Sequence, residues 1–98
     1  MAGIKEEAML KVLELQHTQR LPPNGTPICE REAARKYHIP LTVIHNWVRK
    51  GYVKTIQTPE RRGQRRLIDE RDVAYLAELY PFGKWQVSRI MTILSRLD

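Results

Sequence analysis

The proline at position 40 constrains the fold most, because it separates two short segments that both have a helical pattern. A residue before proline is disfavoured in the α conformation, so a helix over residues 30–37 has to end near His38. Pro40 itself suits the first turn of a new helix, and Gly51 is a natural left-handed stop. The sequence therefore predicts two short helices, residues 30–37 and 41–50, joined by a tight turn.

The second predicted helix has two distinct faces. Apolar side chains recur at helical spacing, which predicts a buried face with the tryptophan in the core. Polar side chains recur on another face, which is either an ordinary solvated surface or an exposed binding surface. A short helix anchored on one side, with hydrogen-bonding groups on the other, suits insertion into the major groove of DNA. The apolar residues are Leu41, Ile44, Trp47 and Val48, and the polar ones are Thr42, His45, Asn46 and Arg49.

The net charge of +6 on 98 residues is unevenly distributed. Residues 29–66 hold ten lysines and arginines against three glutamates, whereas the segments before and after are close to neutral. The excess charge therefore coincides with the predicted helix pair. A cationic surface of this kind is typical of proteins that displace counterions from a polyanion.

Two β-rich runs, residues 52–56 and 66–68, flank a polar loop that contains most of a cluster of four arginines. This pattern predicts a two-stranded hairpin with a basic loop, and the alternative is a disordered solvated loop. In a hairpin, the arginines would hold phosphates or enter a minor groove. The expected DNA-binding cations are Arg61, Arg62, Arg65 and Arg66 in this cluster, with Arg31, Arg35, Lys50 and Lys54 elsewhere in the basic segment.

The N-terminal part of the chain has a different composition. Residues 4–17 have an amphipathic helical pattern, with Met9, Leu10 and Leu13 lying off the main apolar stripe. Residues 18–27 contain three prolines and an Asn-Gly step, which predict a linker or a wrapped loop.

The C-terminal part contains two further helical patterns. Asp69 is a good N-cap for the first of them, and Asp72 stands at the position of a weaker capping box. Residues 84–97 form the clearest amphipathic pattern in the chain, with Trp85 off its apolar stripe. This last helix either closes the core or forms a homodimer or partner face.

These patterns predict a mainly α protein with a small β-hairpin. We divide the chain into an N-terminal helical arm with a proline-rich linker (residues 1–27), a central domain (residues 28–80) and a C-terminal helix (residues 81–98).

The segments EAARKYHIP (residues 32–40), WVRKGYV (47–53) and LIDERDV (67–73) resemble the winged helix-turn-helix of the MerR superfamily. The similarity extends to small relatives of that superfamily, the excisionases of phages and mobile elements, and it covers residues 28–80. It implies that the second helix enters the major groove and that the hairpin is a wing contacting flanking backbone or minor groove. Carried over residue by residue, it implies groove roles for Thr42, His45, Asn46 and Arg49, and wing roles for Arg61, Arg62, Arg65 and Arg66.

The chain departs from full-length MerR regulators in two ways. The long dimerisation helix and effector-binding region do not follow the motif, and a helix precedes it. We therefore expect no small-molecule effector.

Other classes of function have little support. Cys29 is the lone cysteine, and His17, His38 and His45 fall in three different segments, so no metal or cofactor is expected. No pattern indicates catalysis, and no apolar stretch approaches the roughly 18 residues needed to cross a membrane. We expect a cytoplasmic, nucleoid-associated protein that is not an enzyme.

The sequence thus predicts a protein that binds double-stranded DNA, as a small transcriptional regulator or an excisionase-like architectural factor. The alternative is a protein-protein interaction adaptor built on the same scaffold.

Overall fold

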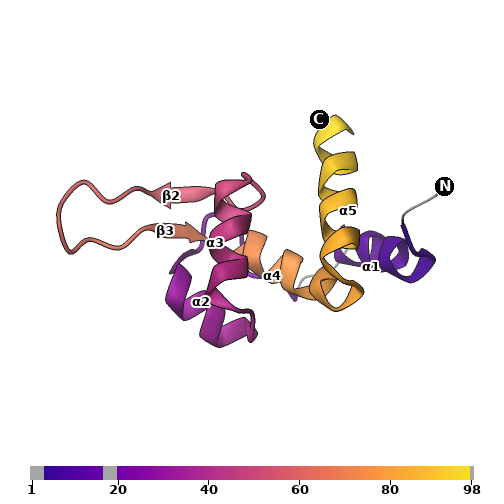
Figure 1. The fold of residues 1–98 in the computed structure, drawn as a ribbon, viewed down its shortest axis with the longest axis horizontal. Coiled ribbons are helices and arrows are strands. Elements are labelled where there is room, and N and C mark those ends of the chain that lie inside the picture. The colour runs from indigo at the N-terminus through magenta and orange to yellow at the C-terminus, as the bar shows by residue number, and fades with distance from the viewer. Residues whose placement is uncertain (1–3, 17–19, 98) are drawn as a thin grey trace.

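The computed structural model describes residues 4–16 and 20–97. It is mostly helical and contains a small three-stranded antiparallel sheet, in agreement with the predicted mainly α fold class. The β2–β3 hairpin extends from one end of the molecule, and α1 and α5 lie at the other end (Figure 1). In chain order the elements are α1 (Glu6–Gln16), β1 (Pro27–Cys29), α2 (Glu30–Tyr37), α3 (Leu41–Arg49), β2 (Thr55–Gln57), β3 (Leu67–Asp69), α4 (Glu70–Leu79), the 3₁₀ helix η1 (Tyr80–Phe82) and α5 (Lys84–Leu97).

The predicted helix pair is confirmed, with α2 and α3 joined by a three-residue turn. The α2 helix ends at His38, which adopts a left-handed conformation with φ 56° and donates its N–H to the Ala34 carbonyl. The α3 helix ends one residue earlier than predicted, and Gly51 follows with φ 81°. A left-handed residue lets the chain leave a helix abruptly. The left-handed His38 therefore allows α3 to begin after a turn of three residues, which keeps the two helices close together.

The sheet differs from the predicted two-stranded hairpin. A third strand, β1, pairs with β3 on the side away from β2, and Ile28 lies opposite Ile68. The strand was missed because it is three residues long, begins with a proline and has no alternating pattern. Its partner is also distant in the sequence, so no local signal identifies the pairing.

The β2 strand also begins later than predicted, at Thr55 instead of residue 52. The backbone N–H groups of Tyr52 and Val53 both donate to the Trp47 carbonyl at the end of α3. These two residues therefore close the helix end and are not available to the sheet.

The apolar face of α3 packs into the core as predicted, except at Leu41. Ile44 and Trp47 are buried, and the Trp47 ring meets Tyr80 edge-on with centroids 6.0 Å apart. Leu41 keeps 42% of its surface exposed, whereas Val43 packs against the core. The reason is position, because Leu41 starts the helix and borders an open hollow between α2, α3 and the hairpin.

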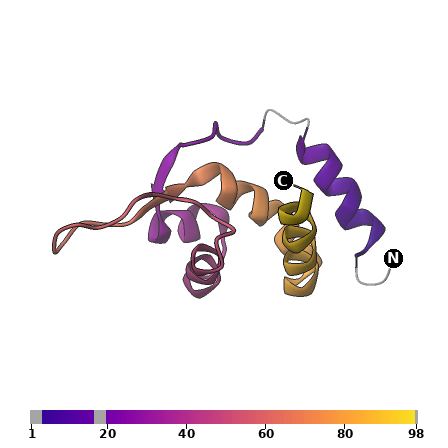
Figure 2. The ribbon, with the colours of Figure 1, turned by 90° about the horizontal axis from the view of Figure 1, so that it is seen from above.

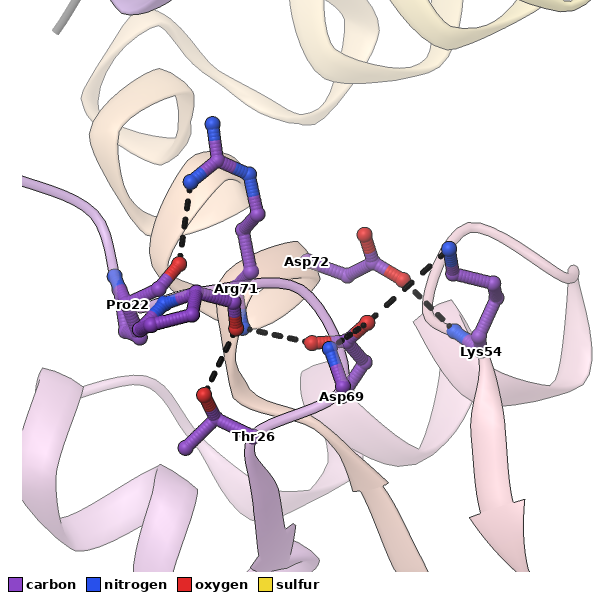
Figure 3. Close-up of polar contacts among 8 residues, drawn as sticks. Pro22, Thr26, Lys54, Asp69, Arg71 and Asp72 are labelled. Atoms are coloured by element: carbon purple, nitrogen blue, oxygen red, sulfur yellow. Dashed lines mark hydrogen bonds and ion pairs between the residues drawn. The ribbon is translucent and has the colours of Figure 1, made fainter. Parts of the chain in front are cut away.

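The N-terminal segment is attached to the start of α4 through Asp69 and Arg71 (Figure 3). Asp69 is the predicted N-cap: its Oδ1 accepts the Arg71 N–H at 3.0 Å, and its Oδ2 accepts the Gly25 N–H at 3.0 Å. The Arg71 guanidinium donates to the Pro22 carbonyl at 3.0 Å. The described part of the predicted linker is therefore held by directed hydrogen bonds as a wrapped loop.

Asp72 does not complete the predicted capping box. Its Oδ2 accepts the backbone N–H of Lys54 at 2.9 Å (Figure 3). The Asp69 N–H donates to the Lys54 carbonyl at 3.0 Å. The sheet offers Asp72 a donor from a distant segment, which the local capping pattern does not reveal. Burial raises the pKa of the Asp72 carboxyl above its ordinary value, although the Lys54 N–H opposes that shift.

A buried carboxylate also joins α2 to α4. The Glu70 Oε2 accepts hydrogen bonds from Lys36 Nζ at 2.6 Å and from Tyr37 Oη at 2.5 Å. Burial by itself raises the pKa of Glu70, but these two hydrogen bonds and the Lys36 charge outweigh it and hold the pKa below its ordinary value. Burial, followed by the hydrogen bond and charge of Glu70, raises the pKa of Tyr37 far above its ordinary value.

The two terminal helices pack beside α4 at the end away from the hairpin (Figures 1 and 2). The α1 helix buries Ala8, Val12 and Leu15, and the Lys5 backbone N–H reaches Gln86 Oε1 of α5 at 2.8 Å. The first half of α5 closes the core, since Val87 and Ile90 are buried. Further along α5, Met91 and Leu94 are half-buried, and the Leu97 side chain lies outside the described part of the structure.

Glu70→Gln is expected to lower the free energy of unfolding by about 1–3 kcal/mol at neutral pH, because charge-assisted hydrogen bonds at a buried position are lost. A carboxyl whose pKa is depressed by folding stabilises above its unfolded pKa, and that contribution disappears as the pH falls through the folded pKa. The difference between wild type and variant should therefore narrow below about pH 4. Urea unfolding at several pH values, monitored by circular dichroism, measures this difference in the free energy of unfolding. The exposed Glu60→Gln is the control, and an equal loss in both variants would contradict the role given to Glu70.

Candidate nucleic-acid interface

The polar face of α3, defined by Thr42, His45, Asn46 and Arg49, is exposed at all four positions. It lies opposite the buried Ile44 and Trp47, so core packing orients it outward. The predicted exposure is confirmed.

One acidic side chain lies at the edge of this face. Glu30 begins α2, and its Oε1 is 3.2 Å from His45 Nδ1, a hydrogen-bonding distance when that nitrogen carries the proton. Its Oε2 is 4.0 Å from the Arg66 guanidinium. Sequence reasoning missed Glu30, because nothing local shows that the start of α2 faces the middle of α3. This carboxylate offsets part of the positive charge where α2, α3 and the hairpin meet.

A hollow opens between α2, α3 and the hairpin, and we call it the hairpin-side hollow. Both Leu41 and His45 of α3 line it, so the polar face of α3 forms one of its walls. Basic side chains from the other two elements complete it, which joins the hairpin to α3 in one continuous surface. These basic residues are Arg31, Arg65 and Arg66.

The hairpin tip has its own hydrogen bonds. Gln64 Oε1 accepts the backbone N–H groups of Glu60 at 2.8 Å and Arg61 at 3.2 Å, and Gly63 turns the chain with φ 90°. These bonds give the loop a defined conformation, so the structure favours the hairpin over the alternative of a disordered loop.

The arginines of the hairpin fall into two groups. Among the described residues, no carboxylate pairs with Arg61 or Arg62, and both side chains are exposed. Arg65 lies 3.9 Å from Glu32 and 3.7 Å from the buried Cys29 sulfur. The outer pair is therefore available to an anion, and the inner pair also contacts the protein.

A second hollow lies on the other side of α3, against α5, and we call it the α5-side hollow. Its lining includes Asn46 and Lys50 of α3 and Lys84 of α5. Trp85, beside it, keeps 77% of its surface exposed, and Lys50 Nζ lies 5.8 Å from the Tyr52 ring. Neither Lys84 nor Trp85 was among the predicted DNA-binding residues, and the available sequence signal was a tryptophan next to a lysine and off the apolar stripe of its helix.

Two predicted cations lie apart from the polar face of α3. Arg35 lines a different hollow with Lys36 and Glu70. The Lys54 ammonium lies 4.0 Å from Asp69, beside the hydrogen bonds that join the sheet to α4. The structure therefore brings Arg31, but neither Arg35 nor Lys54, to the hairpin-side hollow.

Within residues 4–16 and 20–97, no group of three or more His, Cys, Asp or Glu side chains has a metal-binding arrangement. His17, named in the sequence argument against a metal, lies outside the described residues. No helix in the described part of the chain is long and apolar enough to span a membrane.

Comparisons with protein-family models, curated proteins and solved structures found no match for this chain. We therefore infer the function from the geometry and charge of this surface.

Proposed function

We propose that the protein binds double-stranded DNA as a winged helix-turn-helix, with α2 and α3 as the helix pair and the β2–β3 hairpin as the wing. The observation that carries this proposal is the placement of the polar face of α3 between two basic hollows. Arg65 and Arg66 border one hollow, and Lys50 and Lys84 border the other. A duplex lying across this surface would meet hydrogen-bonding side chains in the middle and cations on both sides.

The α3 helix supplies the direct readout in this proposal. A major groove about 12 Å wide admits one helix, and α3 presents four exposed polar side chains to it. Asn46 suits bidentate pairing with adenine, and Arg49 suits guanine or a phosphate. His45 and Thr42 offer further hydrogen bonds.

The hairpin supplies affinity that depends little on sequence. Its exposed arginines would contact phosphates or enter the minor groove beside the site. On the far flank, Lys50 and Lys84 would contact the backbone, with Trp85 packed against sugar. Phosphate contacts on both sides of a helix determine its register in the groove. The base contacts made by the helix then provide the sequence specificity.

The biological role we propose is that of a small transcriptional regulator or an excisionase-like architectural factor in the cytoplasm, associated with the nucleoid. This class is what the resemblance of residues 28–80 to the MerR superfamily implies. The protein would act by occupying a DNA site, by bending it or by recruiting other proteins to it. No catalytic step and no small-molecule effector would be involved.

The second candidate function is a protein-protein interaction adaptor. The observation in its favour is the exposure of Leu10, Leu13 and Ile93 on the terminal helices. Salt distinguishes the two, because binding to duplex DNA weakens steeply with added salt whereas an apolar protein contact does not.

Asn46→Ala and Arg49→Ala are each expected to weaken binding to the preferred duplex by about 1–3 kcal/mol, roughly 5- to 150-fold, and to relax base preference at one position. Selection from a random duplex pool supplies the site, and fluorescence anisotropy at fixed salt measures the affinity. Arg35→Ala is the matched control, because its charge change lies away from α3. Equal effects from Arg35→Ala and Arg49→Ala would count against direct readout.

Replacing both Arg61 and Arg62 by alanine is expected to reduce the salt dependence of binding. Each lost phosphate contact lowers the slope of log K against log salt concentration by about 0.9, so the double variant should lose about 1.8. Affinity for preferred and random duplexes should fall by similar factors. A titration series in KCl measures both quantities, and an unchanged slope would exclude the hairpin from the interface.

Glu30→Gln is expected to increase affinity for any duplex several-fold at low salt, because it removes a negative charge from a surface that would face phosphates. The gain should shrink as salt screens the interaction. Glu78→Gln on α4 makes the same charge change away from both hollows and should have a smaller effect. Anisotropy titrations at two salt concentrations test this, and a loss of affinity in Glu30→Gln would show that its contacts with His45 and Arg66 matter more than its charge.

A further inference from the structure

The terminal helices carry two exposed stripes of opposite charge. On α1 the stripe is Glu6, Leu10 and Leu13, spaced i, i+4, i+7, and we call it the acidic stripe. Leu10 and Leu13 keep 56% and 52% of their surface exposed. The core-facing residues of α1 lie on another side of the helix, so the acidic stripe is left uncovered by the described chain.

The matching stripe on α5 is Arg89, Ile93 and Arg96, spaced i, i+4, i+7, and we call it the basic stripe. All three side chains are exposed. Within the described residues, no carboxylate pairs with Arg89 or Arg96.

The two helices differ in charge as a whole. The α1 helix has three glutamates and one lysine, for a net charge of −2, and α5 has three basic residues and no acidic ones, for a net charge of +3. In α1, Glu14 already pairs with Lys11 and Arg20, but no described cation pairs with Glu6. In both stripes the first and last residues are seven positions apart, so both stripes are about 10.5 Å long and match in length.

We propose that two copies of this chain form a closed two-fold dimer in which the acidic stripe of each α1 packs against the basic stripe of the partner's α5. The charge complementarity selects a second copy as the occupant, because every chain carries both halves of the contact. Both α1 and α5 lie at the end of the molecule away from the hairpin (Figures 1 and 2), and in a two-fold dimer each contact between α1 and the partner's α5 occurs twice. The apolar side chains supply the affinity, and the charges set which helix meets which.

This proposal is independent of DNA binding. If the proposed function also holds, the dimer presents two α3 helices, and the preferred site should consist of two inverted half-sites.

Sedimentation velocity of the full chain without DNA tests the dimer, at protein concentrations from about 1 to 300 μM. Wild type should move from monomer to dimer mass over this range. Leu10→Ser should raise the dissociation constant about tenfold or more, because a central apolar side chain is removed from the interface. Leu41→Ser removes another exposed leucine, on α3, and should leave the dimer unchanged. Wild type that stays monomeric throughout would overturn the proposal.

Charge reversal tests the pairing of the stripes independently of Leu10. Glu7 is next to Glu6 at the start of α1 and is also exposed, so both glutamates are reversed. The variant Glu6→Lys with Glu7→Lys, and the variant Arg89→Glu with Arg96→Glu, should each weaken the dimer about tenfold or more. The variant with all four changes should regain much of the wild-type affinity, because every charged contact is reversed together. These side chains are exposed, so melting temperatures should stay close to wild type. A dimer that survives either reversal, or a fourfold variant that stays monomeric, would show that these stripes do not meet.

Discussion

The buried Asp69 carboxylate holds together three parts of the chain that are far apart in the sequence. It caps α4, accepts the Gly25 N–H of the N-terminal segment and lies beside Lys54 at the base of β2. A carboxylate in this position accepts one backbone N–H from the first turn of α4 and one from the N-terminal loop. The N-terminal segment, the sheet and α4 therefore share one junction, and the backbone hydrogen bonds of Lys54 with Asp69 and Asp72 join the base of the hairpin to it.

The orientation of α3 depends on a second contact, between Trp47 and Tyr80. The edge-on packing of these rings, together with the buried Ile44, fixes which side of α3 faces the core. The Glu70 hydrogen bonds hold α2 against α4. Each helix of the pair therefore has its own contact with the rest of the protein. The exposed polar face of α3 is thus a consequence of core packing.

The molecule is divided between two kinds of surface. The end with the hairpin and α3 is polar and cationic, and we propose duplex DNA as its partner. The end with α1 and α5 presents apolar stripes edged by opposite charges, and we assign it to a second copy of the chain. The residues of the proposed dimer stripes differ from those of the proposed DNA surface, although α5 contributes to both. The Glu30 carboxylate offsets part of the positive charge of this surface, because it lies close to both His45 and Arg66.

The sequence by itself determined the features that depend on local sterics and helical spacing. Pro40 and Gly51 set the ends of the helix pair, and the periodicity of residues 41–49 correctly placed Trp47 inside and Asn46 outside. What only the tertiary structure decided are contacts between distant segments: the pairing of β1 with β3, the hydrogen bond from Lys54 to Asp72, and the approach of Glu30 to His45. These depend on hydrogen bonds and ion pairs across separations of 15 residues or more, for which no short-range pattern exists. Leu41 was predicted to be buried but is exposed for a related reason. Helical spacing shows which residues share a face, but it does not show how far the neighbouring elements extend to cover that face.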